Sequence, residues 1–147
     1  MIDKNLGFTL VRNFDATPAE IWRAWTDPDE AAMWWHPRGV TTPRDSVVID
    51  ARVGGRYAYT MINDANGDEY PTLGVYLEVI ENERLVFTWG NPGEVDDDAL
   101  LITVTIEDLG ELTRMTFDLR GIEGVSGDDN IYDGWEQALD ILAEHLR

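Results

Sequence analysis

The last twenty residues, 128–147, constrain the fold most, because they form the only long stretch with an uninterrupted helical period. Their apolar residues recur at spacings of three and four and therefore share one side of a helix: Ile131, Trp135, Ala138, Leu139, Leu142 and Leu146. A carboxylate at Asp128 or Asp129 can accept the free amides of the first turn, and Arg147 lies at the negative end of the helix dipole. Such a helix must pack against another layer. Its Trp135 end is also a candidate roof for a cavity.

The length of the chain, 147 residues, predicts a single domain spanning 1–147, since a chain of this size buries roughly two thirds of its unfolded surface around one core. Hydrophobic residues make up 44% and charged residues 27%, as is typical of soluble globular proteins. No apolar run reaches the length of a membrane span, and residues 1–14 lack the pattern of a secretory signal. We therefore expect a cytoplasmic protein without membrane insertion, either a monomer or a weak dimer.

The formal net charge of −18 is the most unusual property of the composition. Nucleic acid is not an expected partner, because phosphate contacts need clustered Lys or Arg and a polyanion would be repelled. The acidic surface favours solubility, and a cationic partner is the alternative that it leaves open. The chain has no cysteine and only two histidines, His36 and His145, so neither a disulfide nor a transition-metal site is expected.

Shorter periodic segments predict one strand, two short helices and six further strands before the last helix. The strands are expected at 6–13, 46–51, 56–62, 70–80, 84–89, 100–107 and 112–120. Turn-rich connections between them, such as 63–67 and 108–111, are typical of hairpins and indicate an antiparallel sheet. This order predicts an α+β fold in which a strongly curved sheet of about seven strands surrounds the terminal helix.

The two short helices after the first strand have clear start and stop signals. Thr17 is placed to cap a helix whose first residue is Pro18, and Glu20 completes a capping box. The Asp-Pro pair at 27–28 ends this helix and starts a second one, which ends at 34–35. These helices are expected to close one end of the curved sheet.

Four segments carry a resemblance to a known family: EIWRAWTDPDEAAMWWHPRG at 20–39, VGGRYAYTM at 53–61, GDEYPTLGVYLEVIENERLVFTW at 67–89 and DGWEQALDILAEHL at 133–146. With them, essentially the whole chain resembles the SRPBCC or START-like superfamily, which has the helix-grip (Bet v 1-like) fold. Within it, the chain is similar to the bacterial family named after the C-terminal domain of the heat-shock-protein 90 ATPase activator. The resemblance implies a cavity between helix and sheet but no particular reaction, because this superfamily includes carriers, enzymes and co-chaperone domains.

Aromatic and thioether side chains on the sheet are the main candidates for a ligand site. The resemblance implies that these strand residues face the long helix: Tyr57, Tyr59, Met61, Tyr76, Phe87, Trp89, Met115 and Phe117. On the helix, Trp135 and Leu139 are expected to meet this face. They would pack against Tyr57, Tyr59 and Trp89. Because a buried Tyr or Trp needs a partner for its polar group, several of them on one concave face favour an amphipathic cavity over a dry core.

Two polar residues complete the candidate site. Strand alternation places Glu78 on the same side as Tyr76, and a buried carboxylate must be paired, hydrogen-bonded or protonated. Glu78 is therefore expected either to make a structural hydrogen bond or to orient a ligand or act as a general acid or base. His36 follows Trp34 and Trp35 where family members typically carry a small residue, often glycine. These three residues are expected to border the mouth of the cavity.

Three functions remain open at this point. The first is a non-catalytic carrier or sensor of an apolar, aromatic or lipid-like molecule. The chain has neither a phosphate-binding glycine motif nor an evident Ser/His/Asp set. We therefore expect no cofactor and no catalytic residue. The second is a cyclase-like or hydrolase-like enzyme that uses Glu78, Tyr57, Tyr59 or His36 for proton transfer. The third is a protein-binding module similar to a co-chaperone domain.

Overall fold

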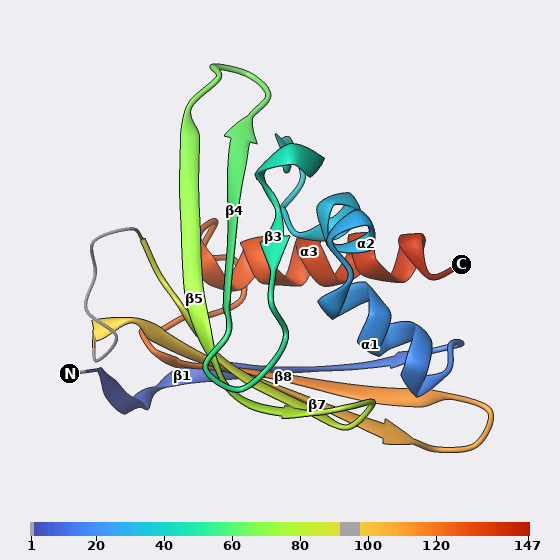
Figure 1. Cartoon of the computed structure of the whole chain (residues 1–147). Coiled ribbons are helices and arrows are strands. Elements are labelled where there is room, and N and C mark those ends of the chain that lie inside the picture. The colour runs from blue at the N-terminus through green and yellow to red at the C-terminus, as the bar shows by residue number, and fades with distance from the viewer. Residues whose placement is uncertain (1, 92–97) are drawn as a thin grey trace.

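A strongly curved antiparallel sheet holds one long helix across its concave side in the computed structural model, which describes residues 2–91 and 98–147. The long helix is α3 (Ile131–His145), and two short helices, α1 (Pro18–Thr26) and α2 (Pro28–Trp34), lie at one end of the sheet (Figure 1). This arrangement confirms the predicted α+β helix-grip fold. Within the described ranges, no helix is both long and apolar enough to cross a membrane.

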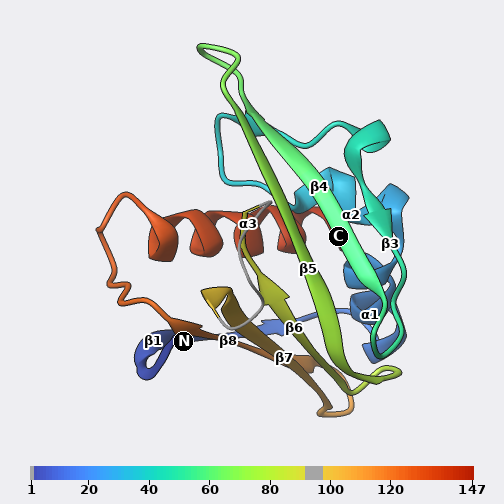
Figure 2. The ribbon, with the colours of Figure 1, turned by 60° about the vertical axis from the view of Figure 1, so that its left-hand side comes forward.

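The sheet has eight strands in the described residues, in the order β1-β8-β7-β6-β5-β4-β2, with β3 also paired to β4. Their bounds are β1 Asp3–Phe14, β2 Val40–Thr41, β3 Val48–Ile49, β4 Arg56–Asn63, β5 Glu69–Ile80, β6 Arg84–Trp89, β7 Leu100–Asp108 and β8 Thr113–Gly121. All neighbours are antiparallel, as the hairpin connections predict. The sequence missed β2, because a two-residue strand shows no alternation. In Figure 2 the long hairpin of β4 and β5 rises past α3 and forms one wall around the helix.

The segment 46–51 differs from its predicted strand. Arg44–Ser46 forms a single turn of 3-10 helix, and only β3 pairs with the sheet. The hydroxyl of Ser46 donates to the Pro43 carbonyl at 2.7 Å and accepts from the Thr60 amide at 3.1 Å. Side-chain bonds of this kind compete with a regular strand ladder, and here they replace its first residues.

The caps of the short helices agree with the prediction. The Thr17 hydroxyl accepts from the Glu20 amide at 3.2 Å, and the Glu20 carboxylate accepts from the Thr17 amide at 3.1 Å, which completes the capping box. Asp27 ends α1 and caps α2, where its carboxylate accepts from the Asp29 amide at 2.8 Å. These caps fix the direction of both helices at the end of the sheet.

Helix α3 begins at Ile131, three residues after the start of the predicted segment. The Asp128 carboxylate accepts from the amides of Asn130, Tyr132 and Asp133 at 2.9 to 3.2 Å, so it satisfies the first-turn donors as predicted, from a position before the helix. The helix ends at His145, so Arg147 lies beyond its last turn.

Trp25 lies at the centre of the core. It is 1% exposed, and its ring is within 6.4 Å of four other aromatic rings, those of Trp34, Phe87, Phe117 and Trp135. Its indole N–H donates to the sulfur of Met115 at 3.3 Å, which gives this buried polar group a partner. The aromatic residues of α1, the sheet and α3 therefore meet at this one side chain.

One close approach in the sheet depends on glycine. The Tyr57 hydroxyl donates to the Thr88 carbonyl at 2.6 Å, and the ring crosses β5 at Gly74. A Cβ at position 74 would lie 1.9 Å from that carbonyl oxygen and 2.7 Å from a ring carbon of Tyr57. Only glycine therefore lets this tyrosine reach its acceptor.

Candidate ligand-binding cavity

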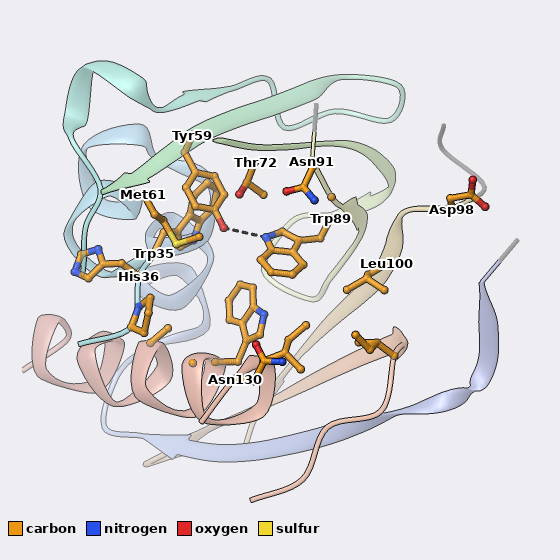
Figure 3. A pocket seen from close by; sticks show the side chains of 17 residues that line it. Trp35, His36, Tyr59, Met61, Thr72, Trp89, Asn91, Asp98, Leu100 and Asn130 are labelled. Carbon is orange, nitrogen blue, oxygen red and sulfur yellow. Dashed lines mark hydrogen bonds between the residues drawn. The ribbon is translucent and has the colours of Figure 1, made fainter. Parts of the chain in front are cut away.

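A partly open cavity of about 480 Å³ lies between the first half of α3 and the strands β4, β5 and β6 (Figure 3). The end of α2 and the start of β7 complete its wall. Its 17 described lining residues are mostly apolar or aromatic: Trp35, His36, Pro37, Tyr59, Met61, Thr72, Trp89, Gly90, Asn91, Asp98, Leu100, Ile122, Asn130, Ile131, Gly134, Trp135 and Ala138. This volume is within the range of 300–1,000 Å³ that is typical of small-molecule sites.

A polar cluster formed by Tyr59, Trp89 and Thr72 lies on the sheet side of the cavity. The indole N–H of Trp89 donates to the Tyr59 hydroxyl at 2.9 Å, and the two side chains point toward one another in Figure 3. Burial raises the pKa of Tyr59 to about 12, although the neighbouring side chains of Trp89 and Thr72 partly oppose this shift. Tyr59 therefore stays a neutral hydroxyl at physiological pH, and it can orient a ligand but not act as an anionic base.

Trp35 separates this cluster from α2. Its ring centroid is 4.9 Å from that of Tyr59 and 5.8 Å from that of Tyr57. Its indole N–H is buried and has no hydrogen-bond partner in the part of the chain that the structure describes. An unpaired buried donor costs roughly 1–3 kcal/mol, so this indole N–H lowers the stability of the fold relative to a hydrogen-bonded one.

His36 lies at the rim of the cavity and contacts Thr42. The Thr42 hydroxyl donates its single proton to the Trp35 carbonyl at 2.7 Å, so the 3.2 Å contact with His36 requires a proton on Nδ1 of the imidazole. Burial lowers the pKa of His36, and the charge of Asp64 only partly offsets this effect. The histidine is therefore a neutral, structurally bonded side chain near pH 7.

The structure brings six of the fourteen candidate residues to the cavity wall: Trp35, His36, Tyr59, Met61, Trp89 and Trp135. Seven others are buried in the aromatic core and are absent from the lining: Trp34, Tyr57, Tyr76, Phe87, Met115, Phe117 and Leu139. Strand alternation places these strand residues on the inward face correctly, but it does not distinguish residues that fill the core from residues that border open space.

Glu78 lies outside the cavity, in contrast to its predicted inward position. The register of β5 against β6 shifts between Tyr76, which pairs with Phe87, and Glu78, which pairs with Val86. This bulge reverses the alternation of β5 after Tyr76. Glu78 is instead half-exposed and forms an ion pair with Arg84 at 3.2 Å.

The contacts of Trp135 also differ in part from the prediction. Its ring is 5.6 Å from that of Trp89, as expected, but its closest aromatic neighbour is Phe117 at 4.6 Å. Tyr57 and Tyr59 pack against Trp35 instead. The second short helix thus places Trp35 next to the tyrosines that were assigned to the long helix.

Sequence reasoning missed several lining residues. Thr72 lies four residues before Tyr76 on β5, so strand alternation places both side chains on the same face and could have identified Thr72. Gly134 lies within the apolar stripe of α3, where a glycine interrupts the period. Leu100 and Ile122 flank the sheet ends, and no local pattern indicates that they meet the helix. Among the described residues, no group of three potential metal-ligating side chains is placed to hold a metal ion.

The curved sheet, the helix that it holds and the cavity between them define a helix-grip protein with an internal site. A family model described as Activator of Hsp90 ATPase homolog 1-like protein matches residues 15–147, and the chain belongs to this family. Among curated proteins, none matches the chain.

Solved structures from several bacteria are similar along nearly the whole chain. A protein from Chromobacterium violaceum is 30% identical, with 95% of this chain and 96% of that chain covered and a TM-score of 0.82. A family member from Silicibacter pomeroyi is 28% identical, with the same coverage and a TM-score of 0.76. A protein from Arthrobacter aurescens is 23% identical, with 99% and 90% covered and a TM-score of 0.82, and this likeness shows the fold alone.

Proposed function

We propose that the protein binds or carries a small, uncharged, apolar molecule in the cavity between α3 and the sheet, without transforming it. The observation that supports this most is a cavity of about 480 Å³ whose mostly apolar wall contains the Tyr59–Trp89–Thr72 cluster. Small-ligand sites combine an apolar lining with a few placed polar groups in this way. The apolar wall would bind the body of the ligand, and the cluster would orient one hydroxyl or carbonyl group.

The charges around the cavity favour an uncharged ligand. None of the 17 described lining residues is Lys or Arg, and the acidic residue Asp98 lies at the edge of the wall. His36 adds no positive charge near pH 7, because burial lowers its pKa. With a net charge of −18 on the chain, an anionic ligand would be repelled and would find no cation to pair with.

The expected affinity is moderate. A ligand that buries about 300 Å² of apolar surface gains about 7.5 kcal/mol at 25 cal/mol per Å². Association removes roughly 4 kcal/mol or more of this gain. Hydrogen bonds to the polar cluster add about 0.5–1.5 kcal/mol each. Dissociation constants from tens of micromolar to millimolar are therefore expected for simple probes.

Two probes with the same alkyl chain test the proposal: 1-decanol, which is neutral, and decanoate, which is anionic at neutral pH. Binding would be followed by NMR shifts of the indole N–H groups and of the Gly134 amide. Decanol should shift the signals of Trp89 and Trp135, and decanoate should bind at least about tenfold more weakly. Tyr59→Phe removes one hydroxyl at nearly constant side-chain volume. This variant should keep the fold and bind decanol more weakly than the wild type.

Three results would contradict the proposal: no binding of decanol, tighter binding of decanoate, or shifts confined to the outer face of the sheet. Native mass spectrometry of protein purified from its own host is a second test, since a retained small molecule would identify the ligand directly. Turnover of that molecule by the purified protein would favour an enzyme instead.

The other two functions have less support. The enzyme hypothesis names Glu78, Tyr57, Tyr59 or His36 for proton transfer. Glu78 is half-exposed in an ion pair with Arg84, and the His36 imidazole contacts the Thr42 hydroxyl. Burial raises the pKa of both tyrosines, so neither is an anionic base near pH 7. The name of the family refers to activation of a chaperone ATPase, and a protein partner would contact an outer surface. Shifts on the outer face of the sheet in the NMR experiment would favour that role.

A further inference from the structure

Gly134 is a glycine that neither the backbone nor the packing of α3 requires. It is the fourth residue of the helix, and its amide donates the first main-chain bond of α3, to the Asn130 carbonyl at 2.8 Å. It is not among the glycines with a left-handed φ. Because glycine is less favourable than any residue but proline inside a helix, this position costs stability.

The surroundings of Gly134 differ from those of glycines that the fold needs. A Cβ at Gly74 would lie 1.9 Å from a carbonyl oxygen, and one at Gly124 would lie 2.7 Å from ring carbons of Phe8. A Cβ at Gly134 would meet no atom within 4 Å apart from its chain neighbours and the nearby backbone of α3. Steric exclusion therefore explains the first two glycines but not Gly134.

The open space beside Gly134 is the cavity. The lining residues of α3 are Ile131, Gly134, Trp135 and Ala138, which are spaced i, i+3, i+4 and i+7 and so share one face of the helix. Any side chain at position 134 would extend from this face. The helix backbone is thus exposed to the cavity at one point, between the larger side chains of Ile131 and Trp135.

We propose that Gly134 determines the ligand specificity of the cavity, by leaving room for part of the ligand to lie against the backbone of α3. This inference rests on the proposed function and adds a size limit to it. The wall that faces this side of the cavity is aromatic, with Trp89 of β6 5.6 Å from the ring of Trp135. The cavity would prefer a ligand whose chain or ring is wide enough to contact both Trp89 and the backbone at position 134. A side chain at position 134 would occupy the space that this part of the ligand needs.

Substitutions of increasing size test this role with two independent measurements. Gly134→Ala and Gly134→Leu should both raise the melting temperature, because they improve helix propensity and add apolar contacts in open space. Gly134→Ala should weaken the binding of decanol slightly, and Gly134→Leu should weaken it by about tenfold or more. The leucine side chain would occupy space that the bound ligand needs, so the liganded site would be overfilled. Glu136→Leu is the control, since it adds the same side chain to α3 outside the cavity lining and should leave the dissociation constant within about twofold.

The outcomes separate the two proposals. If wild-type protein binds decanol and Gly134→Leu binds it equally well, the specificity role is wrong and the proposed function stands. A fall in melting temperature for Gly134→Ala would also overturn the inference, because the helix would then need its glycine. If Glu136→Leu weakens decanol binding as much as Gly134→Leu does, the effect comes from a change in α3 as a whole, and the specificity role of Gly134 is wrong. If the wild type binds neither probe, the proposed function fails, and the ligand role of Gly134 fails with it.

Discussion

Trp25 and Trp135 offer a matched test of how the core and the cavity differ, since the same substitution can be made in two surroundings. Trp25 is 1% exposed, has aromatic rings around it and donates to the sulfur of Met115. Trp135 is 7% exposed and lines the cavity. We expect replacement by alanine to destabilise the protein more at Trp25 than at Trp135.

The magnitudes follow from the area that each ring buries. A buried tryptophan removes about 150–250 Å² from water, which corresponds to about 4–6 kcal/mol at 25 cal/mol per Å². Measured losses for Trp→Ala in cores are about 3–5 kcal/mol. Trp25→Ala should lie at the upper end, about 5 kcal/mol, because its contacts surround the ring. Trp135→Ala should cost about 3 kcal/mol, because the cavity side of its ring already lacks partner atoms.

Urea unfolding followed by far-ultraviolet circular dichroism measures both losses by linear extrapolation, and this signal does not depend on the tryptophan fluorescence that the substitutions remove. Trp25→Phe provides a milder variant if Trp25→Ala does not fold. An equal or larger loss for Trp135→Ala would refute the difference in packing on which the cavity rests. A loss below about 1 kcal/mol at Trp135 would place this residue on the surface and contradict the helix-grip arrangement.

Two further predictions concern charge. Burial lowers the pKa of His36 below its ordinary 6.5, so the folded state resists protonation, and stability that is present above pH 6.5 is lost as the pH falls below it. Wild-type protein should therefore lose more unfolding free energy than His36→Gln in urea titrations between about pH 7.5 and 5, whereas parallel curves would show that the imidazole titrates freely. The net charge of −18 predicts that the melting temperature rises with NaCl, as the screening length falls from about 10 Å at 0.1 M to about 3 Å at 1 M. A flat or falling curve would mean that the carboxylates are already balanced by nearby cations.

The helices show how much of the fold is encoded locally. The capping box at Thr17 and Glu20 and the Asp-Pro pair at 27–28 involve residues a few positions apart, so the sequence alone identifies these helices and their direction. The apolar stripe of α3 likewise predicts which face is buried, and Trp135 and Leu139 are buried as expected. Alternation predicts the inward faces of the long strands for the same reason, because the period of a strand is a local property.

The cavity wall was less predictable, because it depends on contacts between distant segments. The bulge after Tyr76 arises from the pairing of β5 with β6 and reverses the position of Glu78. Trp35, at the end of α2, reaches the tyrosines of β4 because α2 packs against α1 and α3, and α3 is distant from it in the sequence. The turn residues and carboxylates of GNPGEVDDD also predict an acidic loop at 90–98. Most of this segment, 92–97, lies outside the described residues.

The sequence by itself determined the order of the three helices and the longer strands, the amphipathic faces and the family resemblance, since each of these follows from local periodicity, capping or short motifs. Only the tertiary structure decided which aromatic residues fill the core and which border open space. That distinction depends on which side chains extend into the space between helix and sheet. Tyr57 is held over β5 by its hydrogen bond to the Thr88 carbonyl, whereas Gly134 has no side chain to fill the space beside α3. A cavity is a difference between the volume that a fold encloses and the volume that its side chains occupy, and no single segment of the chain specifies both.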